Sequence, residues 1–400
     1  MAVAATTFAA CNKEDITPVV EQGNKSVTLN IANLMQTKGT GTEVAEGTAV
    51  KLNTVQVFFA DANGGLHTPK TVNAKDNADT YFKGTAAVTG TYEFHFLPKA
   101  VSKVIVLGNM PQQTATNQEA LLTAVQALTV GAEQDPENLR LFGIDTELTP
   151  GVVNEDIHDE EDETALPHPN PYVQAEVNLV PTVARFEVTG FEYAQVAAAA
   201  GQNAPARNYT EMVVNSLSVR NWYTTATATF AGAVTPATLD SFATTALNKD
   251  NIYATYFTKV PTTEWYYDAT AYTLNAANNY VQTVATVTVK DDKPVSDKKC
   301  FDYHVFPGAV PQFLIELTGK EDTGLSAPLF LMTSALKVGN KVLAAEVAAT
   351  EADSKVAIEA GKVYRMAMRF DDNNLQAPEK CVEVAITVDD WNVVVVTPEF

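Results

Sequence analysis

Apolar and polar residues alternate in many short segments of this chain, and such period-two alternation is typical of β-strands with one buried face. In residues 26–33, Val27, Leu29 and Ile31 fall on one face, and polar or small residues fall on the other. The same pattern recurs at residues 51–59, 92–97, 103–107, 173–180, 183–188, 212–222, 280–289, 363–370 and 382–388. Clusters of Gly, Asn, Asp and Pro separate these segments, as at residues 61–65. We therefore predict an all-β fold of packed sandwiches.

Two segments depart from the alternating pattern. Residues 117–128 carry Ala120, Leu121, Ala124, Val125 and Leu128 at helical spacing, which predicts a short helical insertion. Residues 155–163 are almost all acidic and are followed by a proline-rich piece at residues 167–171, which predicts a surface loop. Carboxylates suit Ca²⁺, but the spaced Asp-x-Asp-x-Asp-Gly pattern is missing, so a solvated loop is the favoured interpretation.

Composition limits the classes of function. A length of 400 residues suits two or three domains, and 46% hydrophobic residues are enough for packed cores. The formal net charge of −21 repels nucleic acid phosphates and anionic lipid headgroups, which argues against a nucleic acid partner. Three cysteines do not make a disulfide scaffold. Cys300 and Cys381 either pair in an oxidising compartment or stay as buried thiols, and the sequence leaves both open.

The N-terminal segment suggests export and lipidation. Small apolar residues run to Cys11, with Ala9 and Ala10 before it and a polar, charged stretch after it. This arrangement looks like the end of a bacterial lipoprotein signal peptide, in which the cysteine thiol takes a diacylglyceryl group. A signal peptide also has a basic start and a longer apolar stretch, and neither precedes Cys11 here. The alternative is a disordered N-terminus with a chance cysteine.

The sequence does not predict an enzyme, a cofactor or a metal site. The five histidines are scattered without metal-ligand spacing, and no nucleophile elbow or phosphate loop is present in the sequence. Trp222, Trp265 and Trp391 are interpreted as core residues rather than as platforms for sugar stacking.

Taken together, four segments resemble the fimbrillins of Gram-negative Bacteroidales, the type V pilins. The first is the lipobox at Cys11 with a strand soon after it, and the second is the run over residues 47–59. The third is residues 178–188, similar to the segment that joins two sandwich domains, and the fourth is residues 361–370 with the C-terminal region after them.

The resemblance implies two transthyretin-like β-sandwich domains and a division of the chain. Residues 1–38 would hold the signal remnant and a removable strand, with Val27, Leu29 and Ile31 as its apolar residues. Residues 39–182 would form the N-terminal domain and residues 183–400 the C-terminal domain. The chain would be an outer-membrane lipoprotein precursor that becomes part of a cell-surface fimbrium.

The resemblance also implies polymerisation by donor-strand exchange. A surface protease would remove the first strand, and a neighbouring copy would fill the groove with a strand from residues 381–400. The contact is head-to-tail and does not close, so it produces a filament. The predicted donor residues are Val382, Val384, Ile386, Val388, Trp391, Val393, Val394, Val395 and Val396.

The processing site departs from the family pattern. Family members usually present an arginine to a trypsin-like protease, but the first arginine of this chain is Arg140. Lys38 is the basic residue between the first two predicted strands, so cleavage between Lys38 and Gly39 is the predicted maturation step, and a plain surface lysine is the alternative.

The partners expected are therefore further copies of this chain, anchor and tip subunits, a maturation protease, and receptors on host or bacterial surfaces. The alternative function is an outer-membrane glycan-binding surface lipoprotein.

Overall fold

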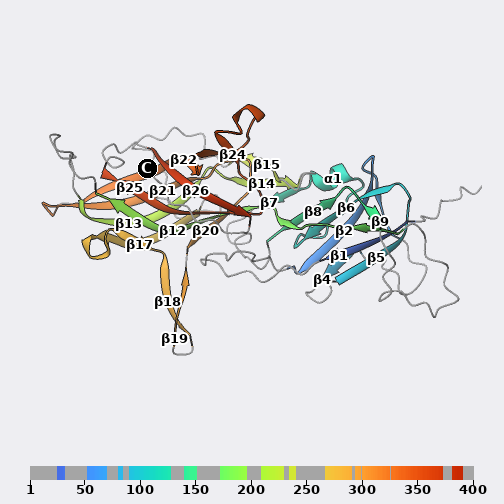
Figure 1. Ribbon diagram of the computed structural model, residues 1–400, viewed down its shortest axis with the longest axis horizontal. Helices are drawn as coiled ribbons and strands as arrows, with labels where there is room; N and C mark the ends of the chain where they lie inside the picture. The colour runs from blue at the N-terminus through green and yellow to red at the C-terminus, as the bar shows by residue number, and fades with distance from the viewer. Residues whose placement is uncertain are drawn as a thin grey trace, which may run out of the picture.

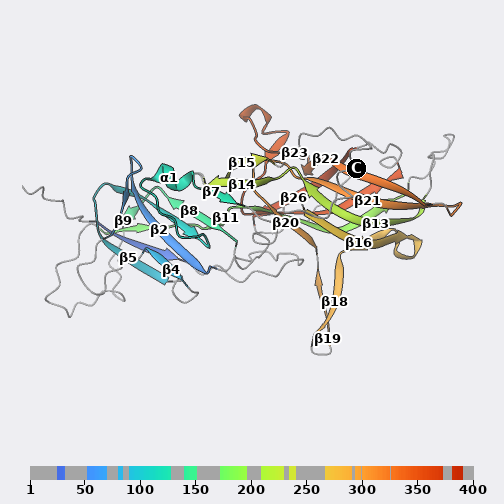
Figure 2. The ribbon, with the colours of Figure 1, turned by 180° about the vertical axis from the view of Figure 1, so that it is seen from behind.

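The computed structural model describes residues 25–31, 52–69, 80–83, 90–127, 139–150, 172–195, 209–228, 234–239, 266–290, 293–298, 300–324, 326–372 and 381–390. These residues form almost entirely β-strands in an elongated molecule (Figures 1 and 2). The prediction of an all-β, multi-sheet sandwich is confirmed. In the part of the chain that is described, no helix is long and apolar enough to span a membrane.

One end of the molecule is a sandwich of two sheets. The four-stranded sheet has the order β5 (Gly90–Leu97), β1 (Lys25–Ile31), β10 (Tyr172–Ala175), β9 (Thr149–Pro150). The six-stranded sheet has the order β11 (Val180–Pro181), β8 (Leu141–Asp145), β6 (Val101–Gly108), β2 (Thr54–Asp61), β3 (Leu66–His67), and β4 (Tyr81–Lys83) also pairs with β2. The rings of Phe59 and Phe94 meet across the interior, 4.9 Å apart, so alternate residues of the two sheets fill one core.

A short helix covers the other face of the six-stranded sheet. Helix α1 (Gln118–Leu122) begins at Asn117, whose side chain caps the backbone N–H of Ala120 at 2.8 Å. Leu121 and Leu122 pack with Ile105 and Phe142 of the sheet. The predicted helix over residues 117–128 is too long, because residues 125–127 form strand β7 (Val125–Ala127) and pair with another part of the chain.

The larger end of the molecule is built from a run of strands that folds over on itself. The path is β16 (Tyr266–Asn275), β13 (Tyr209–Arg220), β21 (Gln312–Glu321), β22 (Ser326–Val338), β26 (Cys381–Asp390), β25 (Lys362–Asp371), β12 (Ala184–Ala194), β17 (Val281–Thr283). Strand β20 (Phe301–Val305) pairs with β12, β23 (Lys341–Ala344) pairs with β22, and β24 (Lys355–Ala357) pairs with β23. Phe186 of β12 and Phe313 of β21 lie 6.0 Å apart between their ring centroids, which shows that the two halves of the path pack face to face.

Two small sheets and two 3₁₀ turns complete the described structure. Strand β7 joins β14 (Tyr223–Ala228) and β15 (Val234–Leu239), so this three-stranded sheet links the two ends of the molecule. The hairpin of β18 (Ala285–Lys290) and β19 (Lys293–Lys298) projects away from the body (Figure 1). The turns are η2 (Ala276–Asn278) and η3 (Ala349–Glu351).

The packing between β13 and β21 leads to a first prediction. Gly319 of β21 lies against the buried ring of Tyr209, and a Cβ atom at Gly319 would clash with the Cδ1 and Cε1 atoms of that ring. Gly319→Ala should therefore lower the free energy of unfolding by about 1–3 kcal/mol, the usual cost of overpacking a core. Urea denaturation measures this change. Lys320→Ala, at the exposed neighbouring position, is the control and should change stability little; equal stability of both variants would contradict the assigned packing.

Candidate functional site

Strand β1 occupies the middle of the four-stranded sheet. It runs antiparallel to β5, with Val27 opposite Phe94, and parallel to β10, with Val27 opposite Val173. Both backbone edges of β1 are therefore paired, and its departure would leave one open edge on β5 and another on β10. We call this position between β5 and β10 the β1 slot.

The apolar residues of β1 reach the shared core. Val27 and Leu29 are fully buried and belong to the same cluster as Phe59, Phe94 and Ala175. Each such side chain contributes roughly 1.5–3 kcal/mol through burial. The third predicted residue, Ile31, ends the strand opposite Gly90, and its side chain lies outside the described part. Loss of β1 would thus open the slot to the core as well as to the two strand edges.

The start of β1 makes polar contacts with its surroundings. The Lys25 Nζ atom donates to the Val101 carbonyl oxygen at 2.5 Å. Burial and the nearby positive charge of Lys99 both lower the pKa of Lys25. This lysine thus donates to a backbone carbonyl in a site that penalises its positive charge.

A chain of three buried side chains joins β1 to β5. Ser26 Oγ lies 2.8 Å from His95 Nδ1, and His95 Nε2 lies 3.5 Å from a Glu93 carboxylate oxygen. The three residues are exposed by 0%, 3% and 1%, respectively. The residue types Ser, His and Glu are those of a hydrolase triad, but here the serine contacts Nδ1 and the carboxylate Nε2, the reverse of a triad, and burial keeps a substrate from the hydroxyl.

Strand β26 holds four of the predicted donor residues inside the chain's own sheet. Its first part, residues 381–386, runs parallel to β22, with Val382 opposite Thr333 and Val384 opposite Leu336. Its last part, residues 387–390, runs antiparallel to β25, with Val388 opposite Tyr364. The strand therefore passes from one sheet of the sandwich to the other, and Ile386 is the last residue paired with β22.

Several predicted sites lie outside the described residues. They are the lipidation residue Cys11, the processing residues Lys38 and Gly39, the acidic segment over residues 155–163, and the donor residues Trp391, Val393, Val394, Val395 and Val396. Trp222 is fully buried, as expected of a core residue. Cys300 is buried, and the side chain of Cys381 lies outside the described part.

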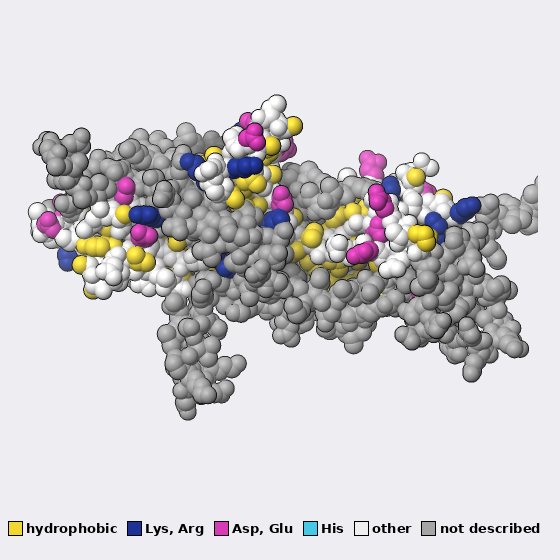
Figure 3. Space-filling view, viewed as in Figure 1, with side chains coloured by type: hydrophobic (Ala, Val, Ile, Leu, Met, Phe, Trp, Pro, Cys, Tyr) yellow, Lys and Arg dark blue, Asp and Glu magenta, His cyan; other side chains and the backbone are white. Residues whose placement is uncertain are grey.

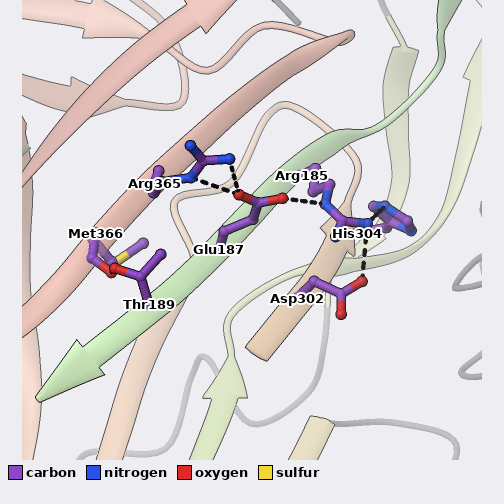
Figure 4. Close-up of polar contacts among 7 residues, drawn as sticks. All are labelled: Arg185, Glu187, Thr189, Asp302, His304, Arg365 and Met366. Atoms are coloured by element: carbon purple, nitrogen blue, oxygen red, sulfur yellow. Dashed lines mark hydrogen bonds and ion pairs between the residues drawn. The ribbon is translucent and has the colours of Figure 1, made fainter. Parts of the chain in front are cut away.

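A buried ion network on β12, β20 and β25 was not predicted from the sequence. Figure 4 shows the Glu187 carboxylate between two arginines, with Arg185 Nε at 2.8 Å and Arg365 Nη2 at 2.6 Å. Asp302 lies 3.0 Å from Arg185 Nη1, and His304 Nε2 lies 3.4 Å from the same nitrogen. Burial lowers the pKa of Arg185, but the carboxylates of Asp302 and Glu187 outweigh it and leave this pKa above its usual value. Arg185 therefore keeps its positive charge inside the network.

The described residues contain no group of three or more His, Cys, Asp or Glu side chains placed to hold a metal ion.

His67 contacts Asp61 at 2.9 Å beside a tight turn. This contact and the backbone N–H of Gly65 both lower the pKa of the Asp61 carboxyl. On the face in Figure 3, charges of both signs are mixed over the described surface of both ends.

Comparisons with known proteins identify the fold. A crystal structure of a fimbrilin (fimA) from Porphyromonas gingivalis aligns with a TM-score of 0.50 at 10% identity, covering 94% of this chain and 99% of that one. A protein from Parabacteroides distasonis, provisionally named a cell adhesion protein, aligns with a TM-score of 0.49 at 13% identity, covering 94% and 99%. The fimbrial anchor protein Mfa2 from Porphyromonas gingivalis aligns with a TM-score of 0.31 at 12% identity, covering 92% and 98%.

No family model matches the chain, and no curated protein matches it. The structural likeness establishes the fold class: this chain has the multi-sheet, all-β fold of a fimbrillin over most of its length.

Proposed function

We propose that this protein is a non-enzymatic structural subunit of a cell-surface fimbria, exported as a lipoprotein through Cys11 and polymerised by donor-strand exchange. The observation that carries the proposal is the position of β1. It is an early segment of the chain, it sits between two strands that come from later segments, and its apolar residues fill the core of the first sandwich. A strand in this position can be replaced by another strand with the same alternation of residues.

The removal step is assigned to cleavage between Lys38 and Gly39. The cut separates β1 from β2, the next described strand, so β1 is then held only by non-covalent contacts. An incoming strand that pairs with both β5 and β10 recovers the two backbone ladders and the apolar contacts. The product should dissociate very slowly, because the ladders and several buried side chains are lost together.

The donated strand is assigned to the C-terminal region, and within it to the part after Asp390. Val382, Val384, Ile386 and Val388 belong to a strand that is already paired with β22 and β25, so their donation would first break those ladders. The run Val393–Val394–Val395–Val396 carries the same apolar character and begins three residues after Asp390, which makes it the preferred donor core. Neighbouring copies of this chain, with anchor and tip subunits at the ends, are the partners, and adhesion and biofilm formation are the roles of the filament.

The proposal predicts an all-or-none result in a polymerisation assay. Limited digestion with a lysine-specific protease should give a ladder of SDS-resistant multimers on unboiled gels, with Gly39 as the new N-terminus. Lys38→Gln should stay monomeric under the same digestion, whereas Lys83→Gln, a change at an exposed lysine of β4, should polymerise normally. A stable monomer after clean cleavage at Lys38 would contradict the proposal and favour an anchor or a glycan-binding lipoprotein.

A further inference from the structure

The β1 slot contains a backbone irregularity at one point. Lys25 pairs with Leu97 and Val27 pairs with Phe94, so the single residue Ser26 lies opposite two residues of β5, His95 and Phe96. Phe96 has a φ of 56°, in the left-handed region that a bulky side chain rarely adopts. Such bulges commonly redirect a side chain, and here the redirected side chain is the buried imidazole of His95.

The imidazole of His95 is part of the wall of the β1 slot, because His95 lies on β5 and not on β1. His95 and Glu93 are both on β5, so they remain when β1 leaves, whereas the Ser26 hydroxyl leaves with it. Nδ1 of His95 lies within hydrogen-bonding distance of the Ser26 hydroxyl, which can donate to this nitrogen or accept from it according to the tautomer of the ring. An apolar residue placed there would remove the hydrogen bond between the strand and this buried imidazole, which is unfavourable.

We propose that the β1 slot selects its incoming strand by a hydroxyl. His95 then favours a serine or threonine at the position of Ser26, next to apolar residues at the positions of Val27 and Leu29. The inference rests on the proposed function and adds to it the register and the chemistry of the donated strand. A one-residue slip would move the hydroxyl away from His95 and also turn the apolar residues out of the core.

The C-terminal sequence contains this pattern in reverse order. Thr397 follows Val396 directly and Val394 by three residues, which matches the spacing of Ser26 to Val27 and Leu29. The reversed order means that the donated strand runs opposite to β1, and thus parallel to β5 and antiparallel to β10. Thr387 has the same neighbours, Ile386 and Val384, but it is paired with Arg365 inside β26, so Thr397 is the assigned residue.

Peptide binding to the cleaved protein tests the inference. The probe is a fluorescent peptide of residues 390–400, added to protein cut after Lys38 and freed of its N-terminal fragment. The Thr397→Val peptide should bind roughly tenfold to a hundredfold more weakly than the native peptide, the range expected for loss of a hydrogen bond to a buried group. The Thr397→Ser peptide should bind within a few-fold of the native one. These peptide variants leave the protein unchanged, so folding of a mutant does not enter the comparison.

Binding of the same two peptides to a His95→Leu variant is the second part of the test. Without the imidazole, the threonine and valine peptides should bind equally well, which a merely structural role of Thr397 would not produce. Equal binding of both peptides to the native slot would overturn the hydroxyl selection while leaving strand exchange intact. If the native peptide fails to bind at all, donor-strand exchange by this segment is itself wrong, so the two failures are distinguishable.

Discussion

A disulfide that ties β1 to β5 is expected to abolish polymerisation completely, even after the chain has been cut at Lys38. Asn30 and Thr91 are direct partners in the antiparallel ladder, where opposite Cα atoms lie about 4.5–5.5 Å apart. That separation falls within the span of a disulfide, roughly 4.4–6.8 Å. Asn30→Cys with Thr91→Cys, in a Cys11→Ser chain, would therefore keep β1 in the β1 slot while leaving its backbone ladders in place.

The measurement is the unboiled SDS gel, run with and without a reductant during assembly. The oxidised protein should stay monomeric and the reduced protein should form the ladder. The matched control carries the same kind of cross-link far from β1, as Glu211→Cys with Lys320→Cys, two direct partners in the β13–β21 ladder. This control should polymerise in both states. A ladder from the oxidised β1–β5 protein would mean that subunits join without emptying the β1 slot.

Period-two alternation predicted most of the strands but not how they end. The first alternating segment is a strand over residues 25–31, close to the predicted range. The segment predicted at residues 173–180 stops at Ala175, because the backbone N–H of Glu176 donates to the Asp145 side chain at 2.7 Å and leaves the sheet. Alternation reports which residues are suited to a sheet, whereas the end of a strand depends on partners that are distant in sequence.

The helical prediction failed for a related reason. Val125 fits a helical pattern, yet it begins β7 and pairs with Thr227 of β14. Tertiary pairing outweighs local propensity here, because three residues of a weak helix gain more from a ladder with a neighbouring strand.

The buried polar and charged residues were the part of the structure that the sequence predicted least well. Arg185 and Glu187 alternate with Phe186 and Val188, which looks like a strand with one exposed, charged face. The structure buries both faces, and the charges find partners on β20 and β25, more than a hundred residues away. Ser26 and His95 were hidden in the same way, because a serine and a histidine in separate strands carry no local signal until the register aligns them.

The network around Glu187 gives the largest expected effect on stability. Glu187 is fully buried and accepts from both Arg185 and Arg365, while Asp302 provides a second carboxylate for Arg185 alone. Glu187→Gln would leave the buried Arg365 without this negative partner, and breaking a buried pair in this way typically costs about 3–5 kcal/mol. Denaturant unfolding followed by tryptophan fluorescence, to which the fully buried Trp222 contributes, measures the change.

Two matched variants separate charge from packing. Glu192→Gln alters the same strand at a partly exposed pair with Arg369, 3.4 Å apart, and should cost under about 1 kcal/mol. The double variant Glu187→Leu with Arg365→Met removes both charges at once and should recover much of the loss, because Arg185 keeps Asp302 and no unpaired charge is buried. If Glu187→Gln were as mild as Glu192→Gln, the two arginines would have to reach water, and the burial assigned to this network would be wrong. The network thus links β12, β20 and β25 near the end of β25 that pairs with β26.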